Sequence, residues 1–198
     1  MVGYGIVKKS PGKPISNIIQ TVTKPSYTIE NAPSDSISGT ITALNGNVDF
    51  QSRIATEAAT ISIPYPAIEQ GEMLQTEENA TTAVTFRDTA AIQIDPKTEI
   101  DFVQTLPINF VLSQASGSAL IKKTGSVPIS IRALHLLVKQ NSGELGIGVD
   151  TDNGLVNLNI VTGSVTVAYN DTELVSHEFD LASGKRFTFN DLTRTFDF

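Results

Sequence analysis

The 198-residue chain contains no cysteine and no tryptophan. Without cysteine it has no disulfides, no thiol chemistry and no cysteine-bound metal site, and this composition suits a protein of an oxidising compartment. No run of about 18 apolar residues is present, so the sequence predicts no membrane-spanning helix. Aromatic residues make up only 7% of the chain, which disfavours sugar binding by aromatic stacking.

Motifs that carry chemistry are also missing. The chain has no GxxxxGK phosphate loop, no GxSxG nucleophile elbow and no HExxH zinc motif. Its two histidines, His135 and His177, are too far apart in sequence to form a recognisable zinc-ligand pattern. We therefore predict no catalytic residue, no metal site, no cofactor and no enzymatic activity.

The charge is acidic and unevenly distributed. The net charge is −7, yet residues 1–29 hold four lysines and no acid, so the remainder carries −11. Such an acidic body should repel phosphate backbones, which argues against nucleic acid as a partner. A basic segment on an acidic body instead predicts attraction between neighbouring molecules.

Residues 1–35 are interrupted by four prolines and rich in glycine, serine and threonine, which predicts an extended N-terminal arm. A short strand is expected from Ile15 to Val22, and strand addition to a neighbour is the expected mode of contact. The candidate interaction residues of the arm are Lys8, Lys9, Lys13, Ile15, Ile18, Ile19 and Val22. The alternative is a solvated, disordered tail.

From residue 36 onward, apolar and polar residues alternate. Within TTAVTFRDTAAIQIDPKTEIDF and the residues after it, apolar pairs begin at Val84, Ile92, Ile100 and Ile108, with a constant step of eight. Strands of about five residues joined by short corners would produce that step. Corners are expected at 87–89, 95–98 and 104–107.

The acids of this stretch raise the question of catalysis. Asp88 and Asp95 fall in predicted corners, whereas Glu99 and Asp101 alternate with core positions. We interpret them as the hydrated face of a sheet, with a pair of catalytic carboxylates as the alternative.

The alternation continues to the C-terminus. A strand with a bulge near Ala133 is expected over 129–138, and Gly163, Gly184 and Asn153-Gly154 mark turns. VDTDNGLVNLNI lacks the glycine and glutamate positions of an EF-hand, so we predict a hairpin there, with weak cation binding by Asp150 and Asp152 as the alternative. The chain is therefore predicted to be all-β.

Several short segments together resemble the FecR-like domain family over about residues 37–190. They are GEMLQT, AVTFRD, AIQIDPKTEI, LNIVTGSVTVAY, LASGKRFTF and ITALNGNVDF. Asp88-Thr89-Ala90 departs from the Asp-Gly-Ser corner of that family, and its Gly-Thr-x-Phe element is replaced near 143–146. The resemblance implies a short-strand β-solenoid or twisted β-sandwich, an extracytoplasmic location in the periplasm or on the cell surface, and a body spanning 36–198 after the 1–35 arm.

These observations favour a non-enzymatic extracytoplasmic module that acts by protein–protein contact and self-assembles by strand addition of its arm. The expected partners are further copies of the chain, as an oligomer or polymer, or another envelope protein. A sensing or relay domain of a FecR-type envelope signalling system is the alternative, and carbohydrate or cell-wall binding is a third hypothesis.

Overall fold

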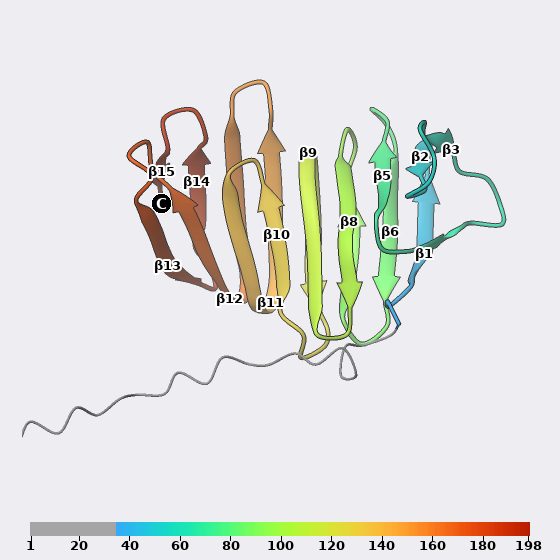
Figure 1. The fold of residues 1–198 in the computed structure, drawn as a ribbon, viewed down its shortest axis with the longest axis horizontal. Helices are drawn as coiled ribbons and strands as arrows, with labels where there is room; N and C mark the ends of the chain where they lie inside the picture. The colour runs from blue at the N-terminus through green and yellow to red at the C-terminus, as the bar shows by residue number, and fades with distance from the viewer. Residues whose placement is uncertain (1–34) are drawn as a thin grey trace, which may run out of the picture. The chain divides into compact units, whose positions relative to one another are not determined.

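The computed structural model describes residues 35–198, which form fifteen β-strands and, in that range, no helix. No segment of this range is therefore a helix able to cross a membrane. All fifteen strands belong to one hydrogen-bonded network that does not close into a barrel (Figure 1). The prediction of an all-β chain is confirmed.

The strands, in chain order, are β1 (Gly39–Asn45), β2 (Val48–Gln51), β3 (Ala59–Thr60), β4 (Ala67–Ile68), β5 (Glu72–Thr76), β6 (Thr81–Phe86), β7 (Ala90–Ile94), β8 (Glu99–Leu106), β9 (Asn109–Lys123), β10 (Ile129–Ala133), β11 (Leu136–Asp150), β12 (Leu155–Asn170), β13 (Ser176–Ala182), β14 (Arg186–Asn190) and β15 (Thr195–Asp197).

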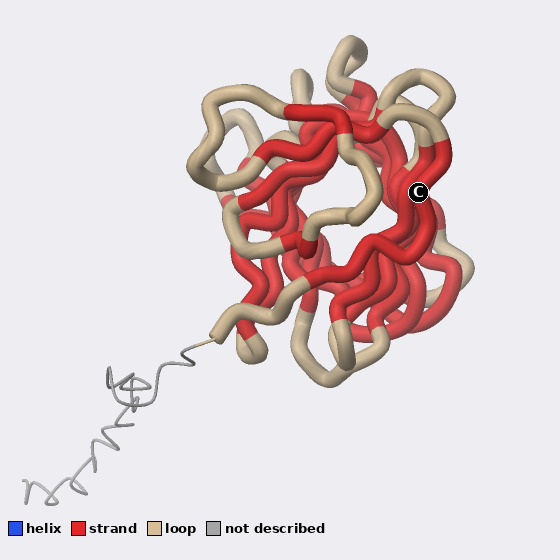
Figure 2. The backbone as a smooth tube through the Cα atoms, turned by 90° about the vertical axis from the view of Figure 1, so that its right-hand side faces the viewer, coloured by secondary structure: helices blue, strands red, loops and turns tan. Residues whose placement is uncertain are grey.

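Three long strands, β9, β11 and β12, each contribute to two layers. Their halves have different neighbours: the first half of β9 pairs with β8 and β10, and its second half with β7 and β11. One layer therefore runs β13-β12-β11-β10-β9-β8-β5-β2-β3, and the other runs β15-β14-β12-β11-β9-β7-β6-β1-β4. All pairs are antiparallel except β9–β10. The result is a sandwich-like fold, seen end-on in Figure 2.

Glycines allow the long strands to bend from one layer to the other. Gly117, Gly143 and Gly163 all have positive φ, at 75°, 79° and 81°. At each bend the buried positions change parity; in β11, for example, they are 136, 138 and 140 before the bend and 145, 147 and 149 after it. One strand thereby lines the core from both sides.

Two of these bends share the sequence Gln-x-Ser-Gly, at 114–117 and 140–143. The buried amide of Gln140 donates hydrogen bonds to the carbonyls of Gly143 (2.9 Å) and Ile121 (3.0 Å). Gln114 makes the equivalent bond to Gly117 at 2.8 Å. The amides hold the bend and supply donors to carbonyls that the interrupted ladder leaves free.

The core follows the predicted alternation, with one displaced pair. Val84, Ile92 and Ile100 are buried as expected, but Ile108 is 57% exposed. It lies in the two-residue turn after β8, which continues to Leu106, so the expected corner at 104–107 begins three residues too early. Phe110 is buried in its place at the start of β9.

The bulge expected near Ala133 was also wrong. β10 ends at Ala133 and β11 begins at Leu136, with Ala133 and Leu136 paired across a tight hairpin. Leu134 has a φ of 52°, the left-handed conformation that such a turn requires. This turn was not predicted, because the apolar residue Leu134 occupies a position where a glycine or an asparagine would indicate a turn.

Candidate functional site

The acids of residues 81–102 lie in two turns and on the outer side of the sandwich. Asp88 is exposed in the β6–β7 turn, and Asp95 lies in the β7–β8 turn. Asp101 is half-buried on the outer face of β8, and burial raises the pKa of its carboxyl while the Arg132 charge opposes that shift. Within residues 35–198 no three His, Asp or Glu side chains gather as metal ligands would.

The predicted hairpin at 150–155 is present between β11 and β12. Asp150 accepts hydrogen bonds from the Asn153 side-chain amide (2.7 Å) and backbone N–H (3.1 Å). These bonds lower the pKa of the Asp150 carboxyl, the side-chain bond most strongly. Both carboxylate oxygens of Asp150 thus accept hydrogen bonds within the turn, and Asp152 is exposed beside it.

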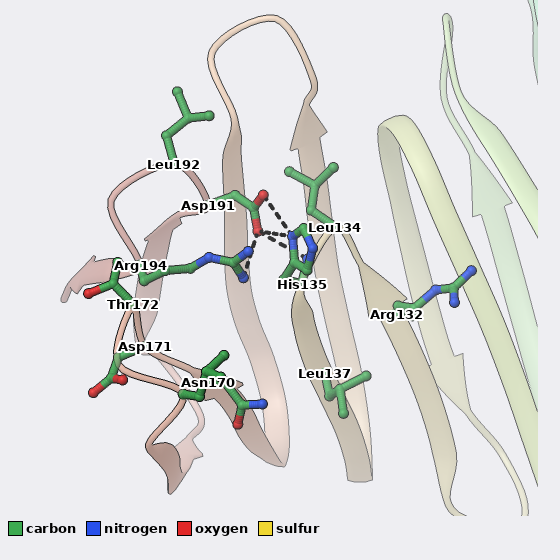
Figure 3. Close-up of a pocket in the computed structure, with 11 residues that line it drawn as sticks. Arg132, Leu134, His135, Leu137, Asn170, Asp171, Thr172, Asp191, Leu192 and Arg194 are labelled. Carbon is green, nitrogen blue, oxygen red and sulfur yellow. Dashed lines mark hydrogen bonds and ion pairs between the residues drawn. The ribbon is translucent and has the colours of Figure 1, made fainter.

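A large hollow lies where three connections meet: β10–β11, β12–β13 and β14–β15. We call this cavity of about 840 Å³ the loop-end groove (Figure 3). The residues lining it are Arg132, Leu134, His135, Leu137, Asn170, Asp171, Thr172, Leu174, Asp191, Leu192 and Arg194.

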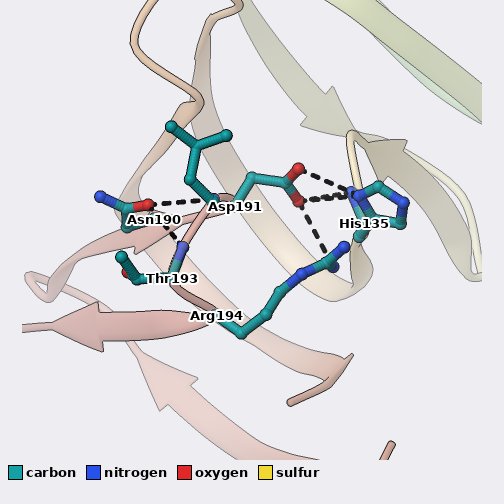
Figure 4. A network of polar contacts seen from close by, with 6 residues as sticks. His135, Asn190, Asp191, Thr193 and Arg194 are labelled. Atoms are coloured by element: carbon teal, nitrogen blue, oxygen red, sulfur yellow. Dashed lines mark hydrogen bonds and ion pairs between the residues drawn. The ribbon is translucent and has the colours of Figure 1, made fainter. Parts of the chain in front are cut away.

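A polar network ties two of these connections together (Figure 4). Asp191 accepts hydrogen bonds from the backbone N–H of His135 (3.0 Å) and lies 3.0 Å from the ring Nδ1 of the same residue. Arg194 Nη1 lies 3.5 Å from the Asp191 carboxylate, which is largely buried. The β10–β11 hairpin is therefore fixed to the β14–β15 turn by one carboxylate.

Asn190 shapes the same turn from within. Its Oδ1 accepts hydrogen bonds from the backbone N–H groups of Leu192 and Thr193, both at 3.0 Å. Arg194 has a φ of 57°, which closes the turn before β15. The local chain thus presents Asp191 toward His135 (Figure 4) and projects Leu192 away from Asp191 and His135 (Figure 3).

Exposed leucines surround this network. Leu137, Leu174 and Leu192 are 55%, 81% and 75% exposed. Arg132 also lines the groove and makes no ion pair with any residue in the 35–198 range. Clustered exposed apolar side chains and arginine are features of protein-binding surfaces.

The second histidine lies at the start of the edge strand β13. His177 Nε2 is 2.8 Å from Asp171 Oδ2, and its ring stacks on Tyr169 with centroids 5.1 Å apart. Asp171 Oδ1 also accepts the backbone N–H of Glu173 and Val175, each at 2.9 Å. The hydrogen bond from His177 is the main cause of the lowered pKa of Asp171.

This lowered pKa predicts a pH effect on stability. A carboxyl whose folded pKa is depressed stabilises the fold above its unfolded pKa, near 3.9, and loses that contribution as pH falls through the folded value. Asp171→Asn keeps an oxygen acceptor for the two backbone N–H groups. We expect the melting-temperature gap between wild type and Asp171→Asn to be present at pH 6 and to shrink by pH 2.5. A gap that is equal at both values contradicts the assignment.

The aromatic residues of the C-terminal third pack between the layers at this end of the sandwich. Phe187 and Phe189 are buried, and Phe187 lies near Phe179, Phe196 and Phe198 with ring centroids 5.5, 5.6 and 5.9 Å apart. The groove itself is lined by no Phe or Tyr of the described range. The rings serve packing, which counts against the carbohydrate hypothesis.

The candidate residues of the arm, Lys8 to Val22, lie outside the described residues. Their role in contact between molecules stays a prediction.

The loop-end groove could not be predicted from the sequence. His135 and Asp191 are 56 residues apart, and no motif joins them. The sequence does contain one indication of this groove. Leucines at 174 and 192 lie within polar turns, where burial in the core cannot explain an apolar side chain.

Comparison with known proteins finds similarity of fold only. Two crystal structures of a putative anti-sigma factor from Parabacteroides distasonis, at 2.50 and 1.65 Å resolution, superpose with a TM-score of 0.53 each. Their sequences are 15% and 14% identical to this one, and the match covers 63% of this chain and 57% of theirs. The chain thus matches less than two thirds of their length. No family model and no curated protein matches it.

Proposed function

We propose that this chain is a non-enzymatic, extracytoplasmic domain of a FecR-type envelope signalling system and that it binds another envelope protein at the loop-end groove. The observation that carries the proposal is the ring of exposed leucines, Leu137, Leu174 and Leu192, around the fixed His135–Asp191 pair. Because the hairpin and the turn are already fixed to each other, little backbone entropy is lost when a partner covers their side chains.

The Asp191 carboxylate of the groove is suited to a structural role rather than to that of a general base. The Asp191 carboxylate already engages the His135 backbone, the His135 ring and Arg194, so it is a structural acceptor. A general base needs a free position within hydrogen-bond reach of a substrate proton.

The fold likeness supports a place in signalling. The structures that share this architecture are of a putative anti-sigma factor, and the segments GEMLQT to LASGKRFTF resemble the FecR-like domain family. Fold alone is an analogy and carries no function by itself. Together, the shared fold and the loop-end groove favour a relay domain that acts through protein contact.

Deleting the gene in the strain that carries it tests this proposal. We expect the transcripts of a defined set of genes to change several-fold, as they would if a sigma factor lost its regulator, and the full-length gene supplied in trans should restore them. The chain should also appear in the periplasmic or surface fraction. An unchanged transcript profile, in cells where an immunoblot detects the wild-type chain, would contradict the relay.

A second function, self-association through the N-terminal arm, is favoured by the open edge of β13. Within residues 35–198, this seven-residue strand pairs with β12 alone. Unpaired backbone groups along such an edge are a template for an added strand.

A further inference from the structure

The open edge of β13 has features that indicate which kind of strand could pair with it. In the part of the chain that the structure describes, four strands have a single neighbour: β3, β4, β13 and β15. The other three contain two or three residues, whereas β13 contains seven. In an antiparallel pair, every other residue turns its N–H and C=O away from its partner, so β13 offers about three such residues to a further strand.

The outer face of this edge is acidic. Glu178 and Asp180 are exposed on alternate positions of β13, and Asp171 and Glu173 precede them, with no lysine or arginine between 170 and 184. Two β13 strands side by side would place acids opposite acids in the central registers, which is destabilising. The edge therefore disfavours its own copy and favours a segment of positive net charge.

The inner face of the edge is aromatic and incompletely covered. Phe179 lies 5.0 Å from Phe196 and 6.0 Å from Phe198 between ring centroids, and the latter two are 41% and 66% exposed. A strand added beside β13 would place every second side chain next to Phe179. β-Branched apolar residues at those positions would cover the exposed rings.

The N-terminal arm of the chain combines a positive net charge with a short apolar segment. Residues Ile15–Val22 hold three isoleucines and a valine, and Lys13 and Lys24 flank them. We infer that the β13 edge accepts residues 15–22 of a second copy as an additional strand, with one alternate pair, Ile15 and Ile19 or Ile18 and Val22, toward Phe179, Phe196 and Phe198. Lys13 and Lys24 then lie beyond the two ends of the added strand, and the positive charge of the arm is attracted to the acidic edge. This inference rests on the self-association proposed above and names its acceptor.

Because the native chain has no cysteine, cross-linking has no background. One full-length copy would carry Asn17→Cys, and a second, tagged to differ in mass, would carry Ala182→Cys on β13. The matched control is Ala59→Cys, which is likewise an exposed alanine of an edge strand but lies on β3 at the other end of the sandwich (Figure 1). A short bis-maleimide tolerates a register shift of a few residues.

We expect the mixed dimer to form with Ala182→Cys at least fivefold more than with Ala59→Cys. It should decrease at least fivefold when Glu178→Lys and Asp180→Lys are added, with circular dichroism confirming that this variant folds. Equal yields at the two sites, or a higher yield at Ala59, would overturn β13 as the acceptor and leave self-association standing. No mixed dimer at either site, together with a monomeric mass by light scattering, would overturn both.

Discussion

Gly143→Ala is expected to lower the free energy of unfolding by about 3 kcal/mol or more, which for a body of this size lowers the melting temperature by roughly 10 °C. Gly143 has a φ of 79°, and an added Cβ would lie 2.2 Å from the carbonyl oxygen of Thr162. The left-handed conformation costs alanine about 1 kcal/mol, and relieving a clash with backbone adds about 1–3 kcal/mol. Thr162 cannot move aside, because it belongs to β12 at its own bend.

Gly184→Ala is the matched control. Gly184 has nearly the same φ, 80°, but an added Cβ would meet nothing within 4 Å. It should therefore cost only about 1 kcal/mol. Denaturant unfolding of both variants measures the difference between their losses of unfolding free energy. That difference reports the cost of the close approach between the two long strands at Gly143. Equal losses would contradict the bent-strand arrangement.

Phe187→Ala is expected to cost about 3–5 kcal/mol, because it leaves a cavity inside the aromatic cluster between the layers. Phe187 is 1% exposed and lies near Phe179 and Phe196, with ring centroids 5.5 and 5.6 Å apart. Phe198→Ala removes a ring of the same cluster that is 66% exposed, so its loss should be below about 1.5 kcal/mol. Chemical denaturation distinguishes the two. A small loss for Phe187 would show that this end of the sandwich is not packed as described.

Local alternation was sufficient to predict the all-β class and most of the core. Val84, Ile92 and Ile100 are buried because a strand alternates its side chains between two faces. The pattern failed at Ile108 and Leu134, where an apolar side chain occupies a tight turn. Turn geometry depends on the pairing of both flanking strands, and that pairing is not local information.

Two features depend on contacts between distant residues and were not predicted. The Gln-x-Ser-Gly bends at 114–117 and 140–143 acquire meaning only when each amide is seen bonding a carbonyl of another strand. The pairing of His135 with Asp191 likewise requires three connections to meet at one end. For the arm, Lys8 to Val22, the prediction from charge and periodicity remains to be tested by cross-linking.

The central claim is that the chain acts by protein contact at the loop-end groove. Complementing the deletion strain with Leu174→Asp combined with Leu192→Asp tests it most directly, with Ile54→Asp combined with Ile108→Asp as the control at exposed apolar positions elsewhere. If the groove binds the partner, transcript levels with the first variant should match those of the deletion, although its melting temperature is that of wild type. The control should restore wild-type levels. Full restoration by the groove variant would contradict the account.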